Sequence, residues 1–382
     1  MPYQEDFEVE QFMDKYETSV EYNLGETCCY SLSLNEIAQL GHCEPFRLDT
    51  NLRLTYGAIK GTDNLREQIA SLYGPDFSKN NVLVTNGAIA ANFLVYYSLI
   101  GPEDHVICVH PTYNQLHSVP KMFNAAVDFL RLKEEDGYAP NIDTLRSMIK
   151  KNTKLIIINN PNNPLGTVIC GDLLNQIYQL CNENNIYLHS DEVYRPIFHS
   201  LPEETIKPPS ACELYNKAIV TGSMSKAFSL AGIRLGWIIT KEHNVLKSAS
   251  SRRDYNTISV SMIDDLIAQY ALQNTEPIIK RNYNLVLDNL QILSQFVHEN
   301  SDLFDFVAKP QGGTVCLLKL KIMKDGYKFA TYLADKYKVL CVPGETLGIP
   351  GTLRIGYANS KHDLLKGLPL LKKAVLDWTD QQ

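Results

Sequence analysis

The chain has 382 residues, of which 45% are hydrophobic and 21% are charged, so it contains enough apolar sequence to bury a large core. Its formal net charge of −7 argues against nucleic acid as a partner. No apolar run reaches the roughly 18 residues of a membrane span, and the acidic start of the chain is unlike a signal peptide. Nine cysteines without the spacing of a metal site indicate reduced thiols and no bound metal, so we expect a cytoplasmic protein without membrane partners.

Seven strand-like apolar runs alternate with helical patterns in the middle of the chain. They lie near residues 82–86, 105–110, 127–132, 155–160, 186–191, 218–223 and 236–240. Such alternation is typical of a mostly parallel sheet with helices on both faces. We therefore predict an α/β fold whose large domain, residues 46–289, contains a mostly parallel seven-stranded sheet.

The two ends of the chain are predicted to form a second, smaller domain. Residues 290–382 carry their own strand and helix signals, including the apolar run Thr314–Leu320. This pattern predicts a small α+β domain. We expect the N-terminal segment, residues 1–45, to join this domain and to cover the functional site.

A lysine at the end of one predicted strand is the most informative feature of the sequence. Lys226 follows the strand 218–223 and lies between small hydroxyl residues, eight positions before Arg234 in a glycine-bracketed turn. Open α/β sheets bind ligands at such strand ends. The hydroxyls of Ser223 and Ser225, with the cation of Arg234, suit a phosphate. Lys226 is then placed to form a Schiff base with pyridoxal 5'-phosphate, as tether and proton carrier, although a surface lysine after a strand has the same local pattern.

Three other strand ends carry residues that fit the same cofactor. Asn163, in a proline-rich turn, and Tyr194 are candidates to hydrogen-bond the ring oxygen, and Asp191 to keep the pyridine nitrogen protonated. The small residues that follow the strand 82–86 begin a helix, whose backbone N–H groups form an anion seat at Gly87, Ala88 and Ile89. Each motif has an ordinary structural explanation, such as a turn or a helix cap. Their joint occurrence, in this order, favours the cofactor site.

These residues together resemble the class I and II aminotransferases of fold type I, which depend on pyridoxal 5'-phosphate. The resemblance covers nearly the whole chain and includes Tyr56–Arg66, Pro310–Gly313, Val342–Gly344 and Leu353–Ala358. It implies that Lys226 carries the cofactor, that Tyr113 stacks on its ring, and that Arg354 binds the α-carboxylate of an amino acid substrate. It also implies that Tyr56 reaches the phosphate of the neighbouring subunit, so that the protein is a homodimer with shared active sites.

Two segments depart from ordinary aminotransferases. Residues 22–33 replace the glycine-rich segment that usually lies beside the substrate and ends in a proline-acid pair, and residues 251–259 also differ. Both resemble the capreomycidine synthases and the cyclodehydratases that form L-enduracididine from γ-hydroxyarginine. This resemblance implies a cyclodehydratase of a hydroxylated arginine.

An acidic N-terminal segment is compatible with a guanidinium substrate. Residues 1–30 hold eight acids, and a carboxylate folded over the site can pair with a guanidinium. Glu10 and Glu26 are the candidates, and Thr27 is a candidate for a further hydroxyl contact. An acidic, solvated amphipathic helix explains the same residues.

Four hypotheses therefore follow for the activity. The first is cyclodehydration, in which the amino group stays on the substrate and water is released. The alternatives are transamination with a 2-oxo acid and, with less support, oxidation of arginine by dioxygen. A non-enzymatic sensor is disfavoured, because Lys226, Asp191 and Arg234 are all present and no basic DNA-binding extension is found.

Overall fold

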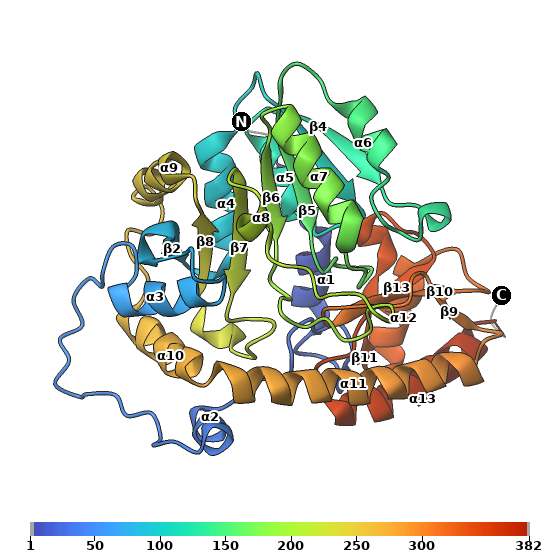
Figure 1. Ribbon diagram of the computed structural model, residues 1–382. Coiled ribbons are helices and arrows are strands. Elements are labelled where there is room, and N and C mark those ends of the chain that lie inside the picture. Colours follow the sequence, from blue (N-terminus) through green and yellow to red (C-terminus); the bar gives the residue numbers. More distant parts are fainter. Residues whose placement is uncertain (1–3, 380–382) are drawn as a thin grey trace.

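The computed structural model describes residues 4–379 and has two regions of α and β structure (Figure 1). The strands are β1 (Tyr22–Asn23), β2 (Val82–Thr85), β3 (His105–His110), β4 (Ala126–Arg131), β5 (Thr153–Asn159), β6 (Tyr187–Asp191), β7 (Ala218–Ser223), β8 (Gly236–Thr240), β9 (Phe304–Phe306), β10 (Val315–Leu320), β11 (Val339–Leu340), β12 (Val342–Pro343) and β13 (Thr352–Gly356). The helices are α1 (Glu8–Tyr16), α2 (Leu34–Gly41), α3 (Asp63–Ser71), α4 (Gly87–Leu99), α5 (Gln115–Met122), α6 (Ile142–Met148), α7 (Gly171–Glu183), α8 (Ala211–Leu214), α9 (His243–Arg253), α10 (Met262–Gln273), α11 (Thr275–Glu299), α12 (Gly326–Tyr337) and α13 (Lys361–Thr379).

The larger sheet contains the seven predicted strands in the order β2-β8-β7-β6-β5-β3-β4. Its strands are parallel except for β8, which runs antiparallel to both β2 and β7. Each of these strands begins and ends within two residues of the position predicted from the sequence. The predicted α/β fold with a mostly parallel seven-stranded sheet is therefore confirmed.

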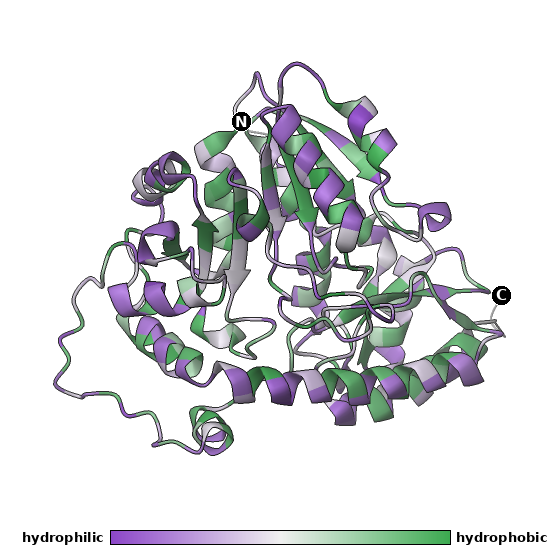
Figure 2. Ribbon diagram, in the orientation of Figure 1, coloured by the Kyte–Doolittle hydropathy of each residue, from purple (hydrophilic) through white to green (hydrophobic). Residues whose placement is uncertain are grey.

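Both faces of this sheet are buried, which explains its continuous apolar strands. In β5, Ile156 and Ile158 belong to one hydrophobic core and Leu155 and Ile157 to a second one, because successive side chains of a strand point to opposite faces. Figure 2 shows the hydrophobic strands between helices whose outward sides are hydrophilic. The core that contains Leu155 also holds residues of α4 and α9.

The second region is built around an antiparallel sheet with the order β12-β13-β10-β9. The predicted strand 314–320 appears as β10. The N-terminal segment joins this region, because β1 pairs in parallel with β11 and α1 contacts β12. Helix α11 runs through position 290 without interruption and spans both regions along the lower edge of Figure 1.

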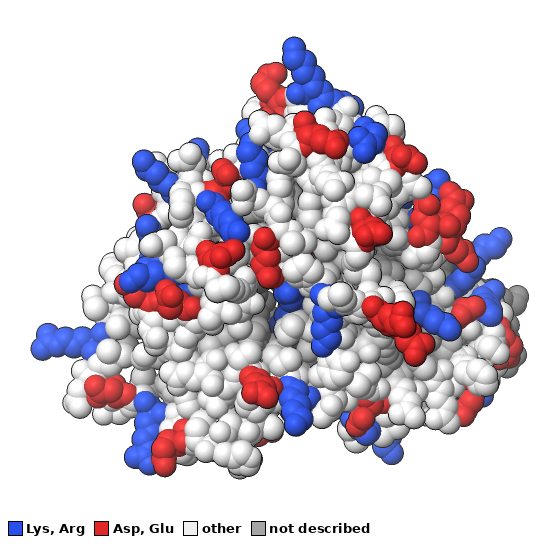
Figure 3. Space-filling view, viewed as in Figure 1, with Lys and Arg blue, Asp and Glu red and all other residues white. Residues whose placement is uncertain are grey.

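The described residues contain no helix that is both long and apolar enough to cross a membrane. Charged side chains of both signs are mixed over the face seen in Figure 3, with no extended patch of one sign on that face. A long segment without helix or strand, residues 44–62, connects α2 to α3 and is seen at the left of Figure 1.

Candidate active site

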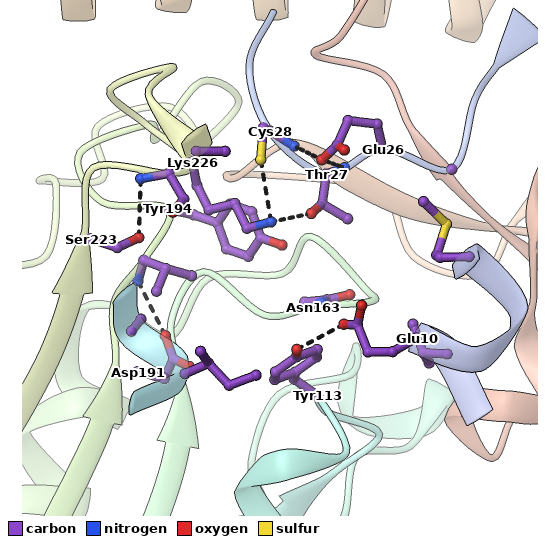
Figure 4. Close-up of a pocket in the computed structure, with 18 of the residues that line it drawn as sticks. Glu10, Glu26, Thr27, Cys28, Tyr113, Asn163, Asp191, Tyr194, Ser223 and Lys226 are labelled. Carbon is purple, nitrogen blue, oxygen red and sulfur yellow. Dashed lines mark hydrogen bonds between the residues drawn. The ribbon is translucent and has the colours of Figure 1, made fainter. Parts of the chain in front are cut away.

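The carboxyl ends of the parallel strands open into a cavity of about 510 Å³ that α1 and the N-terminal segment also line. Most of the site residues predicted from the sequence line it: Glu10, Glu26, Thr27, Ala88, Ile89, Tyr113, Asn163, Asp191, Tyr194, Ser223, Ser225, Lys226, Arg234 and Arg354. Figure 4 labels ten of the lining residues, which come from both regions of the molecule. The cavity is therefore formed between the larger sheet and the second region.

One end of the cavity is suited to an anion. Helix α4 begins at Gly87, whose φ of +76° is accessible mainly to glycine, and a Cβ atom there would lie 2.9 Å from Nη2 of Arg234. The absence of that atom lets the guanidinium lie against the N-terminus of α4, where free backbone N–H groups attract negative charge. Ser223 and Ser225 line the same cavity. These groups provide the donors and the charge that a phosphate requires.

Asp191 ends β6 at the floor of the cavity. Its Oδ2 accepts a hydrogen bond of 3.0 Å from Nδ2 of Asn92, and its Oδ1 accepts one of 3.2 Å from the backbone N–H of Val193. Burial raises the pKa of Asp191 to about 6, although the bond from Asn92 opposes the rise. A buried carboxylate of this kind is stabilised by a cation, such as a protonated pyridine nitrogen.

Asn163 and Tyr194 present polar groups to the same cavity. The side chain of Asn163 is buried and its Oδ1 has no hydrogen-bond partner in the described chain, which is the state expected of a group that awaits a polar ligand. Tyr194 is also buried, and burial raises the pKa of its hydroxyl. Both side chains are therefore available to a ring oxygen.

Lys226 follows β7 and points toward the N-terminal segment, as Figure 4 shows. Its Nζ donates hydrogen bonds to Oγ1 of Thr27 at 2.5 Å and to Sγ of Cys28 at 3.4 Å. Burial opposes its charge, but Cys28, Tyr194 and Glu26 together raise its pKa above the ordinary value. In this state Lys226 is a buried cation held by two neighbouring side chains.

Glu26 supports the residues that contact Lys226. Its Oε1 accepts hydrogen bonds from the backbone N–H groups of Thr27 at 2.7 Å and Cys28 at 2.8 Å. Burial opposes ionisation, yet the nearby Lys226 cation and these hydrogen bonds lower the pKa of Glu26 below its ordinary value. Glu26 therefore carries a negative charge close to Lys226.

Arg354 projects from β13 and is fully buried at the cavity wall. Its Nη2 donates a hydrogen bond of 3.0 Å to the backbone oxygen of Gly25, while its Nε has no partner in the described chain. Burial lowers its pKa, which Tyr194 and Glu10 oppose. A carboxylate is the natural partner for such a guanidinium.

Helix α1 closes the cavity on the side opposite Lys226. The hydroxyl of Tyr113 donates a hydrogen bond of 2.8 Å to Oε1 of Glu10, and the rings of Tyr113 and Phe7 lie 5.1 Å apart. Just before the helix, Glu5 forms an ion pair of 2.6 Å with Lys121 of α5. The N-terminal segment is therefore fixed to the larger sheet as well as to the second region.

Two of the predicted cofactor residues lie outside the cavity wall. Gly87 does not line the cavity but is adjacent to it through Arg234. Tyr56 lies in the segment 44–62 with its side chain 73% exposed, away from the cavity of its own chain. A contact between Tyr56 and a neighbouring subunit stays a prediction.

Several lining residues were not predicted: Asp14, Glu17, Cys28 and Asn92. Asn92 is the one buried polar residue of the first two turns of α4, an otherwise apolar helix, and that contrast was the available signal. Asp14 and Glu17 follow Glu10 at helical spacing, which indicated a shared face. Nothing in the sequence distinguished Cys28 from the other buried cysteines.

His189, which lies near the site, has structural partners. His189 of β6 is fully buried between the hydroxyls of Tyr96, at 2.9 Å, and Thr221, at 3.1 Å. Burial lowers its pKa to about 3, so it is neutral at ordinary pH. Within residues 4–379, no group of three or more His, Cys, Asp or Glu side chains is arranged to hold a metal ion.

The comparisons with known proteins agree with this geometry. The chain is 28% identical to an aspartate aminotransferase of Pyrococcus horikoshii over 332 residues, which are 84% of this chain and 83% of that protein. It is 25% identical to the capreomycidine synthase of Streptomyces vinaceus over 317 residues, 83% of this chain and 80% of that protein. The crystal structure of a PLP-dependent aminotransferase from Streptococcus suis superposes with a TM-score of 0.90 at 34% identity, covering 98% of each chain.

The cavity also fits the cofactor of these proteins. The anion seat at α4, the buried carboxylate of Asp191 and the unpartnered amide of Asn163 match a phosphate, a pyridinium and a ring oxygen. The protein is therefore an enzyme that uses pyridoxal 5'-phosphate. The model of the aminotransferase class I and II family matches residues 28–368, and the chain belongs to that family.

Proposed function

We propose that the enzyme is a cyclodehydratase that converts a hydroxylated arginine, γ-hydroxy-L-arginine, into a cyclic guanidine amino acid of the L-enduracididine type. The observation that carries this proposal is the acidic wall which α1 adds to the cavity. Glu10, Asp14 and Glu17 all line it, and their spacing of four and three residues places them on one face of the helix. A wall of this charge favours a cationic side chain.

In this proposal each cationic side chain that lines the cavity binds a group other than the side chain of the substrate. Among the described lining residues the cationic side chains are Lys226, Arg234 and Arg354. We assign Arg234 to the cofactor phosphate, Lys226 to the cofactor aldehyde and Arg354 to the substrate α-carboxylate. No described lining cation of this chain is left for a side-chain carboxylate, as an aspartate substrate requires.

We assign Glu10 to the guanidinium of the substrate. Its Oε1 is fixed by Tyr113, so the carboxylate is oriented before a ligand arrives. Glu26 also lines the cavity, but its Oε1 holds two backbone N–H groups, which suits a supporting role. Asp14 and Glu17 extend the negative potential along α1 and attract a cationic substrate to the cavity.

The cofactor site is assigned by the same reasoning. Asp191 would hold the ring nitrogen, Asn163 and Tyr194 the ring oxygen, and Tyr113 one ring face. The phosphate would be held by Ser223, Ser225, Arg234 and the N–H groups at Gly87, Ala88 and Ile89. Bound there, pyridoxal 5'-phosphate supplies an electron sink that stabilises negative charge at the substrate Cα.

Lys226 then moves the protons of the reaction. It removes the proton from Cα and later one from Cβ, and it protonates the hydroxyl that leaves Cγ as water. A guanidine nitrogen bonds to Cγ and loses a proton, and Cα and Cβ are reprotonated. The product is the substrate less one water, and its amino group is retained.

The relatives support two candidate reactions. The similarity to a capreomycidine synthase supports cyclisation, whereas the aspartate aminotransferases support transamination with a 2-oxo acid. The two differ in one requirement, because transamination needs an amino acceptor and cyclodehydration does not. Oxidation of plain arginine, the third candidate, consumes dioxygen.

Incubation with γ-hydroxy-L-arginine decides among them. We expect loss of one water, seen by mass spectrometry, in the absence of any 2-oxo acid and without oxygen uptake. Unchanged substrate, together with 2-oxo acid formed once pyruvate is added, would establish the aminotransferase instead. Oxygen uptake with arginine would establish an oxidase, and cofactor binding without any turnover would indicate a sensor.

We also propose that the enzyme is a homodimer. Large apolar side chains are exposed on segments that this chain does not cover, including Leu54 at 73%, Tyr56 at 73% and Tyr255 at 83%. Exposed apolar side chains in such number support an interface. A second copy would bury them and bring its Tyr56 to the phosphate end of the cavity.

A further inference from the structure

The turn Glu26–Cys28 lies beside the amine of Lys226. We propose that Thr27 and Cys28 bind the Lys226 side chain whenever its nitrogen is neither bonded to the cofactor nor transferring a proton. Both are then positioning residues for Lys226. This proposal rests on Lys226 as the residue that bonds the cofactor, and it holds for cyclisation and transamination alike.

The geometry shows two acceptors converging on one nitrogen. Oγ1 of Thr27 lies 2.5 Å and Sγ of Cys28 lies 3.4 Å from Nζ of Lys226, as drawn in Figure 4. Burial raises the pKa of the Cys28 thiol to about 11, so the sulfur faces the ammonium as a neutral acceptor. The amine therefore has a defined position while it is free.

The charge needed to hold an ammonium there comes from Glu26. Its carboxylate accepts hydrogen bonds from the backbone N–H groups of Thr27 and Cys28. The Lys226 cation contributes to lowering the pKa of this carboxylate. The negative charge of Glu26, close to the two acceptors Thr27 and Cys28, offsets the free-energy cost of burying the Lys226 ammonium. The three residues of the turn thus act as one unit.

The turn packs against β13, the strand that carries Arg354, and against Thr314. Nη2 of Arg354 binds the oxygen of Gly25 at 3.0 Å, and the hydroxyl of Thr314 binds the oxygen of Thr27 at 2.5 Å. A Cβ atom on Gly356 would lie 1.7 Å from the oxygen of Glu26, so the two backbones are in close contact. The turn and the carboxylate site are therefore fixed relative to each other.

This arrangement changes the balance between the free and the bonded lysine. Lys226 must leave Thr27 and Cys28 to bond the carbon of the cofactor aldehyde, whose oxygen leaves as water, and it regains them when the amino group of an amino acid replaces it on that carbon. The turn therefore weakens the bond to the cofactor and favours its exchange for a substrate. Loss of the Thr27 hydroxyl should strengthen the bonded state by about tenfold.

The affinity of the full-length chain for two ligands measures this effect. Pyridoxal 5'-phosphate bonds Lys226, whereas 4'-deoxypyridoxine 5'-phosphate lacks the aldehyde and leaves the amine free. Thr27→Val should raise the affinity ratio of the first over the second by about tenfold. Cys28→Ala should give a smaller rise, because sulfur is the weaker acceptor.

The conservative variants provide the control. Thr27→Ser keeps the hydroxyl and should retain the ratio of the unmodified enzyme, as should Cys28→Ser. A misfolded variant is recognised by loss of affinity for the deoxy compound. An unchanged or lower ratio in Thr27→Val would overturn the proposal.

A further variant separates this proposal from the function proposed above. Lys226→Ala should abolish the preference for the aldehyde. If it does not, the assignment of Lys226 fails, and with it both proposals. No amino acid is present in the measurement, so a wrong substrate leaves its outcome unaffected.

Discussion

The side-chain amide of Asn92 donates a hydrogen bond of 3.0 Å to the carboxylate of Asp191, joining the first turns of α4 to the end of β6. The oxygen of the same amide accepts a bond of 2.7 Å from the hydroxyl of Thr221 on β7. Asn92 is therefore fixed in the orientation that presents its N–H group to Asp191. This bond favours the ionised carboxylate that a pyridinium needs.

Replacement of Asn92 should weaken cofactor binding. Asn92→Ala removes the donor, so the pKa of Asp191 should rise further and the affinity for pyridoxal 5'-phosphate should fall by about tenfold. Absorbance titration of the purified variant measures this affinity. Thr221→Val removes a hydroxyl that donates to Asn92 and not to the Asp191 carboxylate, so it should have the smaller effect, and the reverse order would contradict the assignment.

The stability of the cofactor-free protein should depend on pH through Asp191. The pKa of its carboxyl is raised from 3.8 to about 6 by burial. Between pH 3.8 and about pH 6 the folded chain binds more protons than the unfolded chain. The stability that the protonated Asp191 side chain contributes is therefore fully present below pH 3.8 and is lost as the pH rises through about 6. The variant Asp191→Asn has no ionisable group at this position, so its stability should lack this pH dependence.

Urea unfolding at several pH values tests this dependence. The advantage of Asp191→Asn over the unmodified chain should grow from about pH 4 to about pH 6 and then level off. With pyridoxal 5'-phosphate bound, the advantage should shrink, because the ring nitrogen pairs with the carboxylate. A pH-independent difference would show that Asp191 ionises at its ordinary value.

The acidic face of α1 should determine the preference for cationic substrates. Glu10→Gln keeps the contact with Tyr113 but removes the charge, and we expect a rise of about tenfold or more in the KM for γ-hydroxyarginine. Glu8→Gln, on the same helix but not among the residues that line the cavity, is the matched control. Equal effects of the two substitutions would remove the case for a guanidinium at Glu10.

Arg354 should be required for binding the α-carboxylate. Arg354→Lys retains a charge but loses the planar fork of donors, and we expect kcat/KM to fall by at least about tenfold. The affinity for pyridoxal 5'-phosphate alone should stay near that of the unmodified enzyme. A loss of cofactor binding of the same size would indicate that Arg354 supports the fold of the site instead.

Complementation between subunits should reveal a shared site. Lys226→Ala and Tyr56→Ala are each expected to be impaired alone. Mixed dimers of the two variants contain one site with an intact Lys226 and an intact Tyr56 from its partner, so part of the activity should return. No recovery in verified mixed dimers would show that Tyr56 serves its own subunit or none.

Much of the fold was predictable because it depends on local patterns. The continuous apolar runs predicted the strands of the larger sheet, since strands buried on both faces need no polar alternation. The residues at their ends, such as Asp191 and Lys226, could be placed in one cavity because parallel strands present their carboxyl ends at one edge.

Other features depended on contacts between distant parts of the chain. The pairing of Asn92 with Asp191 joins residues 99 positions apart, and the contact of Lys226 with Thr27 joins residues 199 apart. The sequence also offered no means of telling which of the eight N-terminal acids line the cavity, and only some of them do. Periodicity marks the faces of a helix, but it does not tell which face packs against a cavity.

The sequence by itself determined the family, the cofactor and the strands of the large sheet, because these follow from short motifs and from hydrophobic runs. Only the tertiary structure decided that Glu26 hydrogen-bonds the backbone of the turn beside Lys226 and that Glu10 faces the cavity. The physical reason is that the surroundings of a charged side chain, and hence its pKa and its partner, are set by segments that meet only when the chain is folded.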